Sequence, residues 1–266
     1  MLLYSDSIYY HCTVHQSVDR FPYLLMLHGF MGSNKVFEHL LEDLSSFCNP
    51  ITIDLAGHGQ TESPNEQKYY TAQRQVQQLY SIIQRLKFGN LYLYGYSMGG
   101  RLAFQLIASH PELFSGVIIE SSHCGMVSKS ERTERQALDE KRAQKIEQNF
   151  EGFIKEWTTL PLFGQTPDEM KLVYNEIMKS QNPKTISASL RRFGAGVMPS
   201  VCDKISKLNL PFSLIAGKLD KKYVDRMTEI HKSLNHSNLL VVENAGHRVH
   251  ADQPEEIIQI LKSFVS

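Results

Sequence analysis

The sequence predicts an α/β protein with a mostly parallel central sheet, helices on both faces and an inserted helical cap. Short apolar runs alternate with segments of helical spacing along most of the chain, as expected for a sheet covered on both sides. The alternation stops between residues 124 and 200, where the chain becomes charged and helical. With 266 residues, the chain is long enough for one sizeable domain with an insertion, and two independent cores are not required.

Six apolar runs are expected to form strands. Strands of a parallel sheet are buried on both faces, and they therefore read as continuous apolar runs. The runs cover residues 23–27, 51–53, 91–94, 117–119, 212–215 and 239–242.

Apolar residues three or four positions apart predict helices between these strands. One segment covers residues 36–44 after a candidate cap at Asn34, and another covers residues 76–86 after a candidate cap at Thr71. A charge-rich segment at residues 128–150 also reads as helical. We assign residues 1–123 and 201–266 to the core and residues 124–200 to a cap. The alternative for the charged segment is a solvated pair of surface helices without a role.

The composition argues against several classes of function. The 28 basic residues balance the 28 acidic ones, so no overall field favours nucleic acid. No apolar stretch approaches the roughly 18 residues of a spanning helix, and the apolar start reaches Asp6 too soon for a signal peptide. We expect a cytoplasmic monomer or homodimer that neither binds nucleic acid nor inserts into a membrane.

The four cysteines form no recognisable metal or redox motif. They are scattered along the chain without a CxxC pair, at Cys12, Cys48, Cys124 and Cys202. We expect neither a disulfide framework nor a zinc site, and we expect each cysteine to be a small buried apolar residue.

The stretch GYSMGGR, from Gly95 to Arg101, places a serine between two glycines directly after a predicted strand. A sharp turn from strand to helix brings chain segments close together, and glycine avoids the resulting clashes. Ser97 would then lie above the first turn of a helix, where unpaired N–H groups favour negative charge. The combination of strand, turn and helix predicts that Ser97 is a catalytic serine.

Two residues after later strands complete a catalytic set. Asp220 follows the run at 212–215 and His247 follows the run at 239–242, which gives the chain order Ser, Asp, His. All three then lie at the carboxyl ends of strands, where open α/β sheets place their sites. Taken alone, the aspartate reads as a helix cap and the histidine as a loop residue. The joint order favours catalysis.

The backbone N–H groups of Phe30 and Met98 are the expected oxyanion-hole donors. Phe30 lies in the motif LHGFMG at residues 27–32, and Met98 follows the serine. A backbone donor adds no charge and keeps its direction. The Gly-rich stretch DLAGHGQTESP contains His58, which we interpret as a hydrogen-bonded loop histidine.

Arg101 lies four residues after Ser97, one turn along the same helix face, so its guanidinium is expected near the site. The following residues, LAFQLIASH, predict a buried helix, in which an unpaired guanidinium is costly. Its partner is either an internal acidic residue or a substrate carboxylate. Further arginines in the inserted segment favour a substrate with several carboxylates, because guanidinium groups bind carboxylates bidentately. These are Arg132, Arg135, Arg142, Arg191 and Arg192.

The motifs resemble those of the α/β-hydrolase superfamily over nearly the whole chain. HGF, DLAGHGQTES, GYSMGG, the LD that ends at Asp220, and GHRVH occur in the order and spacing of that superfamily. The resemblance implies the α/β-hydrolase fold. It does not define the reaction, because this fold hosts esterases, C–C hydrolases, lyases and proteins without catalytic activity.

A narrower resemblance is to the SHCHC synthases of menaquinone (vitamin K2) biosynthesis, where SHCHC is 2-succinyl-6-hydroxy-2,4-cyclohexadiene-1-carboxylate. It is carried by GYSMGGR, by VIIESSHCGM followed by ERTER, and by EWTTLPLF. These enzymes are lyases that eliminate pyruvate from SEPHCHC, a cyclohexene intermediate with three carboxylates, without an acyl-enzyme. The resemblance implies a small polycarboxylate substrate and no metal or organic cofactor.

At matching positions, the resemblance implies that Ser97 is the base and that Tyr96 and Arg101 lie beside the substrate. Trp157 would form a cavity wall. A cap arginine would clamp a carboxylate, and the repeated E-R spacing leaves the register open between Arg132 and Arg135.

The chain departs from the family pattern at Ser121-Ser122, where relatives can show a glycine pair, and at Thr158, where an aromatic residue is expected. The second departure affects the detailed cavity wall. Two alternative functions remain: a serine hydrolase acting on a carboxylated ester or a C–C bond, and a non-catalytic receptor for a small molecule.

Overall fold

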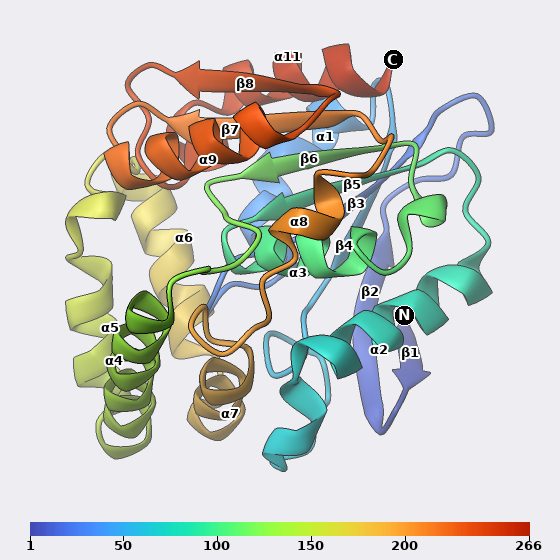
Figure 1. Ribbon diagram of the computed structural model, residues 1–266. Coiled ribbons are helices and arrows are strands. Elements are labelled where there is room, and N and C mark those ends of the chain that lie inside the picture. Colours follow the sequence, from blue (N-terminus) through green and yellow to red (C-terminus); the bar gives the residue numbers. More distant parts are fainter.

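An eight-stranded sheet runs through the computed structural model, which describes residues 1–266 (Figure 1). The strand order is β1-β2-β4-β3-β5-β6-β7-β8, in which the pairs β1-β2 and β2-β4 are antiparallel and all others are parallel. The strands are β1 (Leu2–Ser5), β2 (Ile8–Val14), β3 (Tyr23–Leu27), β4 (Asn49–Ile53), β5 (Leu91–Tyr96), β6 (Gly116–Glu120), β7 (Phe212–Gly217) and β8 (Ser237–Val242).

All six predicted strands are present, and β3 has the predicted bounds. Neighbouring residues of β5 explain why such strands read as continuous apolar runs. Leu93 packs into the apolar cluster on one face of the sheet, and Tyr94 packs into the cluster on the other. The prediction missed β1 and β2, which form an antiparallel hairpin at the edge of the sheet. In β2, buried and exposed residues alternate, so this strand contains no continuous apolar run.

Helices cover both faces of the sheet. Thr71 caps α2 by accepting a hydrogen bond from the backbone N–H of Arg74, as predicted. The cap predicted at Asn34 is wrong, because the side chain of Ser33 caps this segment, which begins as a 3₁₀ helix. The helices of the core are η1 (Asn34–Leu40), α1 (Leu41–Leu44), η2 (Gln67–Tyr70), α2 (Ala72–Leu86), α3 (Met98–Ile107), η3 (Pro111–Leu113), α8 (Cys202–Ile205), α9 (Lys221–Ser233), α10 (Val249–Asp252) and α11 (Pro254–Val265).

The segment between β6 and β7 is helical and gathers beside the end of the sheet toward which the arrows of β6 and β8 point (Figure 1). Arg191 of α7 forms ion pairs with Glu140 and Glu147 of α4, which join these two helices. The helices of this segment are α4 (Lys129–Gln148), α5 (Phe150–Thr158), η4 (Pro161–Phe163), α6 (Asp168–Lys179) and α7 (Pro183–Phe193).

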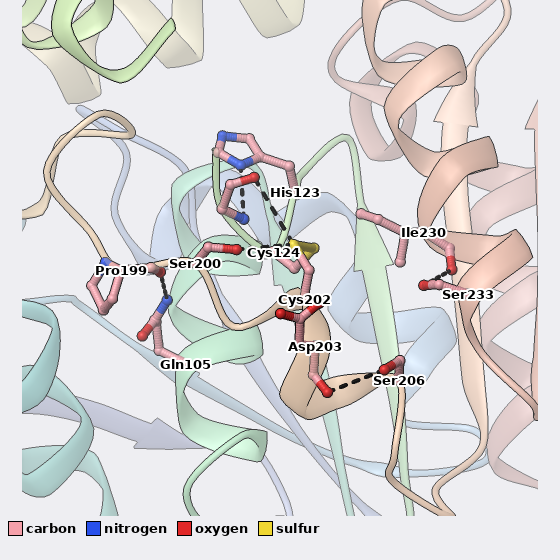
Figure 2. Close-up of a disulfide and its surroundings, with 11 residues drawn as sticks. Gln105, His123, Cys124, Pro199, Ser200, Cys202, Asp203, Ser206, Ile230 and Ser233 are labelled. Atoms are coloured by element: carbon pink, nitrogen blue, oxygen red, sulfur yellow. Dashed lines mark hydrogen bonds between the residues drawn. A yellow bond between two sulfur atoms is a disulfide. The ribbon is translucent and has the colours of Figure 1, made fainter. Parts of the chain in front are cut away.

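Cys124 and Cys202 form a disulfide (Figure 2), so the prediction that all four cysteines are unpaired is wrong. Cys124 follows β6 and Cys202 is the first residue of α8, so the bond joins the two ends of the inserted segment. The partners are 78 positions apart in sequence, and only the fold brings their Cα atoms to 5.1 Å. The other two cysteines are buried and free, as expected, and burial raises the pKa of Cys12 to about 11 and that of Cys48 to about 12.

Candidate active site

Ser97 occupies the sharp turn between β5 and α3. Its φ of 52° lies in the left-handed region, which a serine adopts only when the surrounding structure enforces it. The turn is tight, because a Cβ atom at Gly99 would lie 2.1 Å from the carbonyl oxygen of Leu27. The backbone N–H of Ser97 donates to the carbonyl oxygen of Glu120 (2.9 Å), and the Ser122 hydroxyl donates to the carbonyl oxygen of Ser97 (2.7 Å). The end of β6 and the residues directly after it therefore hold the serine in place.

Asp220, His247 and Ser97 form a continuous hydrogen-bonded chain. His247 Nε2 lies 2.9 Å from Ser97 Oγ, and His247 Nδ1 lies 2.6 Å from Asp220 Oδ2. Because the carboxylate accepts the Nδ1 proton, Nε2 is left to accept the proton of the serine hydroxyl. Asp220 occupies the N-cap position of α9, but its side chain makes no capping hydrogen bond to that helix and bonds to His247 instead.

Phe30 and Met98, the expected oxyanion donors, line the same cavity as Ser97. Met98 is the first residue of α3, and its N–H therefore has no partner within the helix. The N–H of Phe30 donates to no other backbone group. His28 precedes these donors in the loop after β3: its Nδ1 lies 2.8 Å from the carbonyl oxygen of Gly29, and its Nε2 accepts from the N–H of Leu55 (3.0 Å). Burial lowers the pKa of His28 to about 4.

A cavity of about 390 Å³ opens above Ser97 and is enclosed by core and inserted helices. Its wall contains five basic side chains and a single acidic one, the Asp220 that already bonds to His247. Of the predicted substrate-binding residues, Tyr96, Arg101, Arg135 and Trp157 line the cavity and Arg132 does not. The basic residues of the wall are Arg101, Arg135, Arg142, Lys222 and Arg248.

Arg101 has no carboxylate partner, although it is only 7% exposed. Its guanidinium donates to the carbonyl oxygen of Phe193 (3.1 Å) and lies 5.4 Å from the centre of that ring. Burial, aided by the charge of Arg135, lowers the pKa of Arg101 to about 10. The internal ion pair considered from the sequence is therefore absent, and a buried positive charge faces the cavity.

Fewer arginines of the inserted segment reach the cavity than the sequence suggests. Arg132 donates to the carbonyl oxygen of Gly196 (3.3 Å) and does not line the cavity, so of the two arginines left open by the sequence it is the one that does not reach the site. Arg135 reaches the wall while bonding to both carboxylate oxygens of Asp139, each at 2.9 Å. Arg142 lies over the ring of Trp157, at 5.1 Å, and also lines the cavity. Arg191 pairs with α4, as described above, and Arg192 is exposed.

For the Lys221-Lys222 pair and Arg248, the sequence favours a solvated surface over a place near the site. Lys222 is exposed as expected but lines the cavity, and the prediction is wrong for Arg248, which is buried in the cavity wall. The available signal was their position, since they lie close in sequence to Asp220 and His247. Tyr223 was missed altogether; its ring centre lies 4.7 Å from that of His247. His58 bonds to the carbonyl oxygen of Ala56 (3.0 Å) and does not line the cavity, as expected of a loop histidine.

No group of three or more histidine, cysteine, aspartate or glutamate side chains is arranged to hold a metal ion. None of the helices combines the length and apolar character that a membrane crossing requires.

Comparison with known proteins supports the fold. The family model for the alpha/beta hydrolase fold matches residues 22–254. The chain belongs to the alpha/beta hydrolase family. A family relative from Bacillus subtilis (strain 168), provisionally named 2-succinyl-6-hydroxy-2,4-cyclohexadiene-1-carboxylate synthase, is 34% identical over 247 residues, which cover 91% of this chain and 90% of that protein. A second relative, from Salmonella paratyphi B (strain ATCC BAA-1250 / SPB7), is named 2-succinyl-6-hydroxy-2,4-cyclohexadiene-1-carboxylate synthase. It is 25% identical over 92% of this chain and 94% of its own length.

Solved structures with a similar fold lead to the same family. MenH from S. aureus superimposes with a TM-score of 0.89 and 27% identity, covering 96% of this chain and 97% of that one. An esterase from Exiguobacterium antarcticum shares the fold, with a TM-score of 0.79 and 20% identity over 97% and 95% of the two chains. The predicted fold class is therefore confirmed.

Proposed function

We propose that the protein is an SHCHC synthase, a carbon–oxygen lyase that eliminates pyruvate from SEPHCHC in menaquinone biosynthesis. The observation that carries the proposal is the cavity above Ser97, whose wall is strongly basic and contains a buried Arg101 without a carboxylate partner. A site for neutral esters is lined mainly by apolar side chains and leaves no guanidinium unpaired. Two relatives named as SHCHC synthases and the similarity to MenH support the same activity.

In the proposed reaction, Ser97 acts as a base. His247, oriented by Asp220, takes the proton of the Ser97 hydroxyl. The serine oxygen then removes the proton on the ring carbon that is attached to the succinyl ketone. The electron pair of that C–H bond forms an enolate, whose oxygen accepts hydrogen bonds from the Phe30 and Met98 N–H groups. As the enolate collapses back to the ketone, its electron pair forms a new ring double bond, the double bond already in the ring shifts by one position, and the carbon–oxygen bond to the enolpyruvyl group breaks. The leaving oxygen keeps that electron pair, and the enolpyruvate takes the proton that His247 holds and becomes pyruvate, so Ser97 and His247 return to their starting states.

The substrate is proposed to be held by charge and by aromatic walls. Arg101 binds one carboxylate, since its guanidinium donors in the cavity have no anionic partner. Tyr96 and Trp157 form walls beside it. Arg135 is the cap-borne clamp in preference to Arg132, because it reaches the cavity. Its bonds to Asp139 orient the guanidinium while leaving other donors for the substrate.

The segment 124–200 is proposed to act as a cap on a core formed by residues 1–123 and 201–266. It contributes Arg135, Arg142 and Trp157 to the cavity wall, so the site is incomplete without it. We place the protein in the cytoplasm, where a small polycarboxylate from biosynthesis is available.

A serine hydrolase acting on a carboxylated ester or C–C bond is the second candidate. The observation that favours it is the strained turn at Ser97, which also suits a nucleophile. The two candidates differ in the fate of Ser97, because a hydrolase forms a covalent acyl-serine and the proposed lyase does not.

The test supplies SEPHCHC to the purified protein and follows pyruvate release. We expect turnover in the wild type and a loss of orders of magnitude in Ser97→Ala, with an unchanged fold by circular dichroism. Intact-mass measurement during turnover should show unmodified protein. Pyruvate release no faster than in Ser97→Ala would overturn the proposal, and an acylated Ser97 would support the hydrolase.

A further inference from the structure

Arg248 is a second buried arginine in the cavity wall. It directly follows His247, and its side chain is only 4% exposed. Its Nε atom has no hydrogen-bond partner. Two carboxylates in the same region are engaged elsewhere, because Glu120 bonds to His250 (2.8 Å) and Asp252 bonds to Thr166 (3.0 Å). Arg248 therefore carries a positive charge that no acidic side chain neutralises.

The phenols beside Arg248 do not neutralise it either. The charge of Arg248 favours ionisation of Tyr96 and Tyr174, but burial outweighs this effect and holds the pKa of both phenols above the usual range. Both side chains are therefore neutral at physiological pH. An unpaired guanidinium in a buried environment is costly, so Arg248 needs an anionic partner that the chain itself does not supply.

Aromatic rings restrict how an anion can approach Arg248. Its guanidinium carbon lies 3.9 Å from the ring centre of Phe163 and 3.6 Å from that of Tyr174. Rings of the inserted segment thus pack against the guanidinium, and Tyr96 lies beside it as well. The Nε–H group has no hydrogen-bond partner and is available to a ligand oxygen. In-plane N–H groups match the two oxygens of a carboxylate.

The support for this guanidinium is rigid. The hydroxyl of Tyr174 lies 2.6 Å from His250 Nε2, and His250 Nδ1 lies 2.8 Å from Glu120 at the end of β6. A binding group that is ordered before the ligand arrives loses less entropy on binding. This chain from Glu120 to Tyr174 shares no hydrogen bond with Arg101, whose partners are Phe193 and Met198.

We infer that Arg248 is a further carboxylate-binding residue, which contacts the substrate at a different part of the cavity wall from Arg101. The inference rests on the proposed function and specifies it further: the enzyme selects substrates that carry two separated carboxylates. With Arg101 on α3 and Arg248 after His247, the two guanidinium groups fix the orientation of such a substrate over Ser97.

A binding experiment tests this without turnover. The probe is 4-(2-carboxyphenyl)-4-oxobutanoate, an aromatic dicarboxylate without a leaving group, compared with its two monomethyl esters by isothermal titration calorimetry. In the wild type, the dicarboxylate should bind about 10- to 100-fold more tightly than either ester, as expected for one charged hydrogen-bonded pair. In Arg248→Met, one ester should bind as tightly as the dicarboxylate. The exposed cap arginine variant Arg192→Met should behave like the wild type.

The alternative is that Arg248 only anchors the cap by stacking on Phe163 and Tyr174. Arg248→Met would then lower the melting temperature and leave the preference for the dicarboxylate intact, and this result would overturn the inference. Should Arg248→Met fail to fold, Arg248→Lys decides, because it keeps the charge and loses the two-donor edge. We expect weaker dicarboxylate binding in Arg248→Lys, and wild-type affinity there would refute the inference. If the wild type binds as expected but releases no pyruvate from SEPHCHC, the proposed reaction fails and the carboxylate site stands.

Discussion

Breaking the Cys124–Cys202 disulfide should destabilise the protein by several kcal/mol. The bond closes a loop whose ends are 78 positions apart in sequence. Loop-closure entropy for that length gives about 4.5 kcal/mol at 25 °C, because the cross-link restricts the unfolded chain. At about 2 to 4 °C for each kcal/mol in a chain of this size, the melting temperature should fall by about 9 to 18 °C.

Thermal unfolding with and without a phosphine reductant measures this effect. The variant Cys202→Ser should melt at the temperature of the reduced wild type and should not respond to the reductant. Alkylation of the denatured protein provides the control, since the oxidised wild type should expose only Cys12 and Cys48 as free thiols. A wild-type shift below about 2 °C, with the reduction verified by alkylation, would refute the reasoning.

Three further predictions concern the site and its support. Asp220→Asn should lower kcat for pyruvate release by about 10⁴-fold, because the histidine loses its orienting carboxylate; a loss below tenfold would contradict this role. Arg135→Met should raise KM for SEPHCHC well above the value for Arg132→Met, since only Arg135 lines the cavity, and equal KM values would count against the clamp. Stability should fall between pH 7 and pH 5, because the unfolded chain protonates His28 near pH 6.5 and the folded chain only near pH 4. The decrease in the free energy of unfolding that is due to His28 is about 2 kcal/mol. Urea unfolding of wild type and His28→Asn at both pH values measures it, and an identical pH response in the two proteins would disprove it.

Much of the parallel sheet could be predicted because its strands are apolar on both faces. The turn at Ser97 was also predictable, since the glycines around it are dictated by close backbone approach. Asp220 and His247 followed from their positions after later strands. Local spacing was sufficient for all of these features.

Features that depend on how distant segments dock could not be predicted. The Cys124–Cys202 pair arises from the closure of a long insertion. The choice between Arg132 and Arg135 depends on which face α4 turns toward the cavity. The burial of Arg248 is created by Phe163 and Tyr174 of the inserted segment, and nothing in the local sequence GHRVH indicates those rings.

The central claim is that Ser97 removes a proton from carbon and does not attack a carbonyl. The most direct measurement is the isotope effect on pyruvate release from SEPHCHC. The substrate carries deuterium on the ring carbon that is attached to the succinyl ketone. We predict a several-fold decrease in kcat/KM for the deuterated substrate, with no covalent adduct on Ser97. Equal rates for the two substrates, together with an acylated Ser97, would contradict the account.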